Sequence, residues 1–170
     1  MALTFADYED AVLLALQPLL LATSKDPDSG ADVTTGYLLS LAGQAGQIQM
    51  TADGFIITTL QGFPAVVVEV FDATYKSNST AYYTQEVTLN IFAVARSWRD
   101  QAEARGGDQG AYQMLSDIRD ILHGNTIGLD IRKSGLELQK EQRLIADKTM
   151  VIYLAAYRFF NDRIPAIQVA

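Results

Sequence analysis

The stretch of sequence that decides the fold is Gln85-Glu86-Val87-Thr88-Leu89-Asn90-Ile91-Phe92-Ala93-Val94-Ala95-Arg96. Its residues alternate between two faces, as the residues of a strand do: Val87, Leu89, Ile91, Ala93 and Ala95 share one face, and Thr88, Asn90, Phe92, Val94 and Arg96 form the other. A polar connector with glycines, residues 97–108, follows and leads into an amphipathic helix over residues 110–123. The segment carries almost no catalytic chemistry, which indicates a protein that works through its surfaces.

The composition predicts one domain over residues 1–170 with a sizeable core. The chain has 170 residues, of which 49% are hydrophobic and 19% are charged, and this suits a single domain of ordinary size. It contains no cysteine. The sequence therefore excludes a disulfide framework, a thiolate metal site and a cysteine nucleophile.

The net charge of -7 limits the partners of the chain. Proteins that hold nucleic acid through its phosphates need clustered lysine and arginine, so we expect contact with DNA only in transit. An acidic chain is also a poor binder of anionic membranes. The acidic N-terminus lacks the basic region of a signal peptide, and the apolar run over residues 11–22 is too short to span a bilayer. We expect a soluble protein that stays in the cytoplasm of the cell that makes it.

Three further regions give weaker predictions. Thr4 and Asp7 have the spacing of a capping box, and the apolar periodicity predicts a helix over residues 5–23, with a kink or break before Pro18. Residues 33–47 are compatible with helix or strand. Residues 55–60 are compatible with a strand or a short helix.

Three more strands are predicted. Residues 65–71 are β-branched and apolar, and a polar tip over residues 72–84 connects them to the long strand. Residues 136–144 and 148–160 form a hairpin. Its first arm is polar on both faces, as in an edge strand, and its second arm is apolar, as in a central strand.

For the helix over residues 110–123, Asp108 is the expected N-cap and Gly124 the glycine after the C-terminus. Its expected apolar stripe consists of Tyr112, Leu115, Ile118 and Leu122.

These elements predict an α+β fold: a two-layer sandwich of about four mainly antiparallel strands with two main helices on one face. Residues 164–170, which include Ile164 and Ile167, are apolar and are expected to lie past the last strand. We expect this tail either to fold back or to dock on another subunit.

No residue pattern points to catalysis, a cofactor or a metal. His123 is the only histidine, and at a helix C-terminus it is better explained as a cap whose cation the helix dipole favours. The carboxylates of residues 7–10 and of Asp117 and Asp120 are expected on solvated faces or at caps. The glycines of residues 106–110 lack the spacing of a P-loop or a dinucleotide site. We therefore expect no enzyme.

The interface candidates are aromatic and basic. Exposed aromatic residues near loop tips are favoured at protein interfaces, which selects Tyr75, Tyr82, Tyr83 and Trp98, although Trp98 fits equally well as the lid of the core. Arg96, Arg99 and Arg105 cluster around the connector. We expect them to face acidic surfaces of a partner or neighbouring subunit; the alternative is that they are solvated loop charges.

The sequence also resembles a known family. The relevant runs are Val94-Ala95-Arg96-Ser97-Trp98-Arg99, then Ala102-Glu103-Ala104-Arg105-Gly106-Gly107, then Gly110-Ala111-Tyr112-Gln113-Met114-Leu115, and finally Ile121-Leu122. Together with Phe63-Pro64-Ala65-Val66-Val67-Val68 and the helix from Tyr8 to Leu20, they resemble the tail-terminator family of Mu-like contractile-tailed bacteriophages and of R-type tailocins. The resemblance extends from about Tyr8 to Phe160.

The resemblance implies a small α+β subunit that forms a homohexameric ring, caps the tail tube, ends its polymerisation and meets the sheath and the neck or head. The protein would be made in the bacterial host cytoplasm and become part of a virion or tailocin tail. One rival is another tail tube, neck or head-completion ring component. A more remote rival is a small hydrolase that uses acidic residues.

Overall fold

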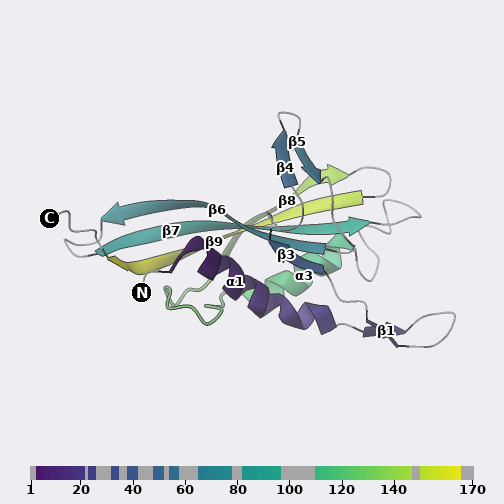
Figure 1. Cartoon of the computed structure of the whole chain (residues 1–170), viewed down its shortest axis with the longest axis horizontal. Helices are drawn as coiled ribbons and strands as arrows, with labels where there is room; N and C mark the ends of the chain where they lie inside the picture. Colours follow the sequence, from purple (N-terminus) through teal and green to yellow (C-terminus); the bar gives the residue numbers. More distant parts are fainter. Residues whose placement is uncertain are drawn as a thin grey trace.

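The computed structural model describes residues 3–21, 23–25, 32–34, 38–41, 48–51, 54–57, 65–77, 82–96, 110–146 and 150–165. The helices are α1 (Phe5–Leu16), the 3₁₀ helix η1 (Gln17–Leu21) and α3 (Ala111–Leu122). The strands are β1 (Thr23–Lys25), β2 (Asp32–Thr34), β3 (Leu38–Leu41), β4 (Ile48–Thr51), β5 (Gly54–Ile57), β6 (Ala65–Ser77), β7 (Tyr82–Arg96), β8 (Glu137–Ala146) and β9 (Met150–Pro165) (Figure 1).

The main sheet has the strand order β3-β6-β7-β9-β8. Its four long strands, β6, β7, β9 and β8, pair antiparallel, and the short strand β3 adds to β6 in parallel. Two separate antiparallel pairs, β1 with β2 and β4 with β5, stand outside this sheet. The predicted α+β class, with four mainly antiparallel strands and two main helices, is confirmed.

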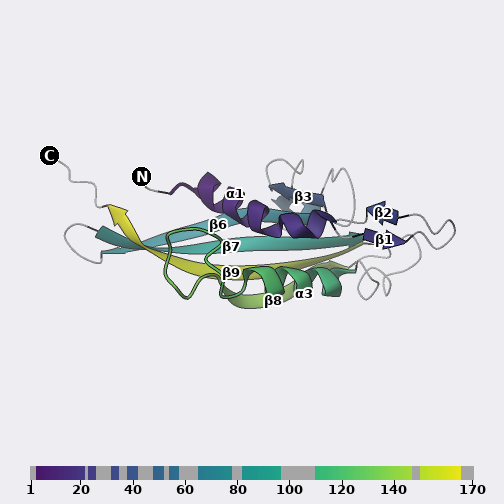
Figure 2. The same cartoon turned by 90° about the horizontal axis from the view of Figure 1, so that it is seen from below.

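Both helices cover one face of the sheet (Figure 2). α1 contacts β6, α3 contacts β7 and β9, and the two helices contact each other. One buried cluster joins them to the strands; from α1 it includes Tyr8, Val12 and Leu16, from α3 Met114, Leu115, Ile118 and Leu122, and from β7 Val87, Leu89, Ile91, Ala93 and Ala95. The apolar face predicted for β7 is therefore the face that binds the helices.

The opposite face of the sheet has its own, smaller apolar cluster. It contains Ala65, Val67, Phe92, Val94, Ile152 and Leu154. Phe92 and Val94 belong to the second face predicted for the long strand. These side chains are buried. The sheet is therefore apolar on both faces where β6 and β9 begin and β7 ends, and on one face elsewhere.

α1 begins as its sequence predicts. The Thr4 hydroxyl accepts a hydrogen bond from the backbone of Asp7, whose carboxylate accepts one from the Thr4 backbone, and together they form the capping box. The α-helix ends at Leu16 and continues as η1 through Pro18, because proline cannot donate the next helical hydrogen bond. The predicted break before Pro18 is confirmed, but the helical region ends at Leu21 and not at residue 23, where β1 begins.

α3 differs from its prediction at two points. Its N-cap is Gly110, which makes no side-chain capping bond, rather than Asp108, which lies outside the described residues. Tyr112 is half exposed and does not belong to the buried stripe; its ring packs edge-on against Tyr153. Met114, which was not predicted to be in the core, is buried on the same side of α3 as Leu115, Ile118 and Leu122. Gly124 has a φ of 73°, as predicted for a residue that ends a helix.

The longest strands extend further than predicted. The polar tip expected over residues 72–84 is mostly strand, because β6 continues to Ser77 and β7 begins at Tyr82. β9 likewise includes Ile164 and Pro165, which pair with Tyr83 and Tyr82. The tail boundary expected at residue 164 therefore falls inside a strand. The two undecided regions contain strands: β2 and β3 within or next to residues 33–47, and β5 at residues 54–57.

Ile118→Asp is expected to unfold the domain. Ile118 is fully buried between α3 and the sheet, so the substitution removes a core side chain and places an unpaired carboxylate there, at a cost of ~4 kcal/mol or more. Gln113→Glu adds a carboxylate on the exposed side of the same helix and should cost about 1 kcal/mol at most. Thermal melting followed by circular dichroism compares the two. Equal melting temperatures would contradict the packing of α3.

Candidate functional site

The paired ends of β6, β7 and β9 project past the start of α1 (Figures 1 and 2). We call this region, residues 72–77, 82–88 and 158–165, the hairpin end. Three of the predicted interface residues lie there: Tyr75, Tyr82 and Tyr83 are exposed by 55%, 48% and 37%. Just before this region, Phe71 is exposed by 58% at a β-bulge of β6, where it is the extra residue between Val70 and Asp72. The hairpin end therefore presents aromatic side chains on a paired, extended scaffold.

A buried polar cluster connects α1 to the hairpin end. The Tyr8 hydroxyl donates to Gln85 Oε1 at 2.6 Å and accepts from Asn161 Nδ2 at 3.0 Å. Gln85 Nε2 in turn donates to the Tyr75 hydroxyl at 2.9 Å. Tyr8 is fully buried, and its burial raises the pKa of its hydroxyl, so it remains a neutral donor. The cluster holds the start of α1 in register with β7 and β9, and it orients Tyr75.

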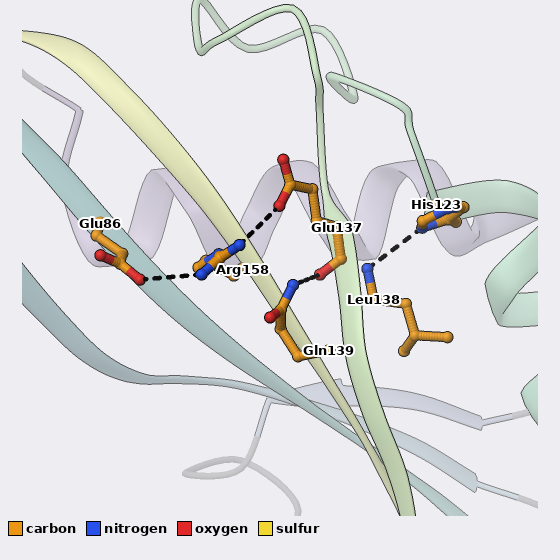
Figure 3. Close-up of polar contacts among 6 residues, drawn as sticks. All are labelled: Glu86, His123, Glu137, Leu138, Gln139 and Arg158. Carbon is orange, nitrogen blue, oxygen red and sulfur yellow. Dashed lines mark hydrogen bonds and ion pairs between the residues drawn. The ribbon is translucent and has the colours of Figure 1, made fainter.

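On the other face of the hairpin end, Arg158 lies between two carboxylates (Figure 3). Its Nη2 donates to Glu137 Oε2 at 3.0 Å, and its Nη1 lies 3.7 Å from Glu86 Oε1. The pKa of Glu137 is lowered, chiefly by the hydrogen bond from Arg158. These contacts connect three neighbouring strands, β7, β9 and β8, by side chains in addition to their backbone pairing.

A second arginine attaches the loop that follows α3 to β9. Arg132 donates to both carboxylate oxygens of Asp162 at 2.7 and 2.9 Å, and its guanidinium carbon lies 4.4 Å from the centre of the Phe160 ring. Thr84 donates to the same carboxylate at 2.9 Å. The Arg132 hydrogen bond is the main cause of a lowered pKa at Asp162. Bidentate pairing with stacking on a ring is a geometry that arginine forms and lysine does not.

The loop itself closes through its backbone. Gly124 N donates to Leu136 O at 2.8 Å, and Leu136 N donates to Asn125 O at 3.0 Å. Gly135 has a φ of 66°, and a Cβ there would lie 2.6 Å from the backbone of Asn125. Only glycine fits this position, and the closed loop places Arg132 against β9.

The remaining predicted interface residues are distributed as follows. Arg96 is the last residue of β7, at the end of the strand far from the hairpin end, and its backbone pairs with Met150. Ile164 lies in β9 at the hairpin end. Trp98, Arg99, Arg105 and Ile167 lie outside the described residues. The structure thus brings the tyrosines and the backbone of Ile164 together and separates Arg96 from them by the length of β7, about 45 Å.

His123 occupies the C-cap of α3, as predicted. Its Nδ1 accepts a hydrogen bond of 3.2 Å from the backbone nitrogen of Leu138 (Figure 3). The ring thereby connects the end of α3 to β8. The described residues contain no group of three or more side chains suited to hold a metal ion.

Sequence reasoning missed the polar cluster and the arginine pairs. The sequence does contain a signal for the polar cluster. Gln85 lies two residues before Val87 and four before Leu89 in the strand, so its side chain is on the same buried face and needs a hydrogen-bond partner there. No comparable pattern identifies Arg132 or Arg158, because their partners come from strands and loops distant in sequence.

Asp162→Asn is expected to lower the melting temperature near neutral pH and to have a smaller effect in acid. Arg132 holds the pKa of Asp162 below its ordinary value of 3.8, so the pair stabilises the fold above that pH. This contribution is lost as the pH falls through the lowered pKa of the folded state. Melting curves between about pH 7 and about pH 2.5 measure it. Asp10→Asn, which removes an exposed carboxylate of α1, is the control. If the melting temperature of Asp162→Asn differed from that of the unaltered chain by the same amount at every pH, the pairing would be contradicted.

Residues 8–160 match the model of the family described as Bacteriophage Mu, Gp37, which covers most of the chain. No curated protein matches the sequence. Within the described part of the chain, no helix is long and apolar enough to cross a membrane. The chain therefore belongs to the bacteriophage Mu Gp37 family, and as such it is a tail-related structural protein of the Mu-like phage type.

Proposed function

We propose that this protein is a tail terminator: a homohexameric ring that sits on the last ring of the tail tube, ends its polymerisation and meets the sheath and the neck or head. The match to the bacteriophage Mu Gp37 family over residues 8–160 is the observation that carries the proposal. The resemblance of the connector and α3 to tail terminators adds the specific role.

The hairpin end is the surface best suited to contact the tube or the neck. Its tyrosines stand on β6 and β7, which pair with each other and, through β7, with β9. The Tyr8 cluster and the arginine pairs fasten these strands to α1, to β8 and to the loop after α3. A surface that is already ordered loses little conformational freedom on binding. Tyrosine adds large apolar contact area with a polar tip, which suits it to the centre of an interface. Trp98, Arg99, Arg105 and Ile167 remain proposed contacts of the same assembly.

The net charge supports a lumen through which DNA passes without being held. Each subunit carries -7, so a ring of subunits repels the phosphate backbone. The proposed partners are accordingly proteins: other copies of the chain, the tube, the sheath and the neck or head connector. The protein would be made in the bacterial host cytoplasm and become part of the virion or tailocin tail.

The main alternative is a tube, neck or head-completion ring component. Electron microscopy of the purified protein separates these functions. A terminator should give single rings that do not stack, and its deletion from the parent phage or tailocin should give tails of irregular, excessive length. Purified protein that grows into tubes would instead indicate a tube subunit. Tails of normal length and number after deletion would contradict the terminator and the alternative components alike.

Tyr82→Ala with Tyr83→Ala is expected to leave rings intact and to abolish their attachment to tails. Both side chains are exposed at the hairpin end, so the double substitution should cost the fold about 1 kcal/mol or less while removing interface contacts. Co-sedimentation with purified tails measures attachment. Tyr112→Ala removes a tyrosine of similar exposure from α3 and is the matched control. Equal attachment of the two variants would contradict the role of the hairpin end.

His123→Ala tests the remote hydrolase alternative. The substitution removes one hydrogen bond on an exposed ring and should cost about 1 kcal/mol, with tail assembly unchanged. Thermal melting and particle yield are the two measurements. A variant that melts normally but yields no functional particles would favour a catalytic role for the only histidine.

A further inference from the structure

The two edges of the main sheet differ in how they are covered. β3 pairs only with Ala65–Val68, so from Glu69 onward β6 has no neighbouring strand on its outer side among the described strands (Figure 1). On the other side, β8 has no hydrogen-bonded neighbour on its outer side among the described strands, and β5 contacts part of it. An edge that is not paired with another strand presents backbone groups to other chains unless side chains prevent or direct the contact.

The β6 edge is acidic where its cover ends. Glu9 of α1 reaches this edge, and its Oε1 accepts a hydrogen bond of 2.9 Å from Val70 N. Glu69 is the preceding residue, and its pKa is raised, first by burial and second by the charge of Glu9. Neither carboxylate forms an ion pair within the described part of the chain. The edge thus has two neighbouring carboxylates whose repulsion a cation would relieve.

The β8 edge offers a cation. Lys140 is exposed and, within the described ranges, has no ion-pair partner. The acidic residues of the same strand are already paired: Glu141 with Arg119 at 2.7 Å and Glu137 with Arg158 at 3.0 Å. Among the described residues nothing therefore competes for Lys140, and its ammonium group can pair with a carboxylate of another chain.

The strand register places the two edges at the same level. Glu69 pairs with Asn90, Asn90 with Ala156, and Ala156 with Lys140. Residues that lie directly opposite in antiparallel strands point to the same face, so Glu69 and Lys140 end one row across the sheet, on the face away from the helices. A neighbouring copy turned about an axis parallel to the strands brings its Lys140 to Glu69 without any shift along that axis.

We propose that copies of this chain join head to tail through these edges, with Lys140 of one copy pairing with Glu69 and Glu9 of the next. The inference rests on the proposed function and identifies the subunit contact of its ring. Because β8 runs antiparallel to β6, the two edges meet in the antiparallel sense. A heterologous contact without a rise closes into a ring, whereas one with a rise continues as a helical filament.

The contact is made by side chains. β8 has bulges at Gln139 and at Leu144, on either side of the segment that holds Lys140. Bulges interrupt the row of backbone groups and keep an edge from extending another sheet without limit. A charge pair between such edges directs one partner in one register, and it makes the assembly sensitive to salt.

Reciprocal charge reversal tests the contact. Lys140→Glu alone should set like charges against each other at every contact and weaken ring formation by about ten- to a hundred-fold, and Glu69→Lys alone should do the same. An equimolar mixture should form rings again. In the mixture, the glutamate introduced by Lys140→Glu meets the lysine introduced by Glu69→Lys. At the next contact, Lys140 of the second variant meets Glu69 of the first, as in the unaltered chain. The rescued rings should contain the two variants alternately and in equal numbers.

Mass photometry and native mass spectrometry give the ring size and the composition. Lys133→Glu and Asp120→Lys make the same charge changes at exposed positions away from both edges, and they should assemble as the unaltered chain does. Circular dichroism shows whether each variant is folded.

The outcomes separate the two proposals. An unaltered chain that stays monomeric, at high concentration and on tails, overturns both the ring and the edge contact. Rings that form equally well from each single variant overturn the edge contact and leave the tail terminator in place. Folded variants that fail alone and also fail when mixed overturn the pairing of Lys140 with Glu69.

Discussion

The fold depends on the register between β7 and β9. The two strands pair from Tyr82 with Pro165 to Arg96 with Met150, and together they form the centre of the sheet. Because side chains alternate between faces, a slip of one residue would turn the apolar row of β7 away from both helices. The same register sets which residues end each row at the two edges of the sheet. The core, the hairpin end and the alignment of Glu69 with Lys140 therefore share one cause.

The buried polar cluster shows what this register requires at the hairpin end. It places Gln85 and Asn161 on the helix face, where each is almost fully buried. An amide buried there without a partner would cost about 1–3 kcal/mol, and the Tyr8 hydroxyl removes that cost by accepting from one amide and donating to the other. The Tyr8 ring packs edge-on against Phe159, with ring centres 4.9 Å apart. One residue of α1 thus contributes to the core and completes the polar cluster, so the start of the helix has little freedom to shift.

Much of this fold could be predicted from the sequence, because the main elements have strong local patterns. The alternation in β7, the capping box at Thr4 and the apolar stripe of α3 gave the layers and their contacts. Local patterns failed where the chain is polar but still paired. Residues 72–77 have the composition of a loop, yet they form a strand because β7 pairs with them. The paired side chains of Arg132 and Arg158 depend on tertiary contacts that no spacing in the sequence reveals.

The two directions of the sheet have different chemistry, and this difference bears on how an assembly of such subunits would be organised. Along the strands, the hairpin end carries exposed tyrosines, whose contacts are mostly apolar and insensitive to salt. Across the strands, the β6 edge carries the neighbouring carboxylates of Glu69 and Glu9, and the β8 edge carries Lys140. This arrangement favours a head-to-tail contact, in which the β8 edge of one copy meets the β6 edge of the next, over a two-fold contact, in which each edge would meet the same edge of its partner. In the proposed ring, lateral contacts between subunits would therefore weaken with salt, whereas contacts with the tube or the neck would persist, because each uses a different side of the same rigid sheet.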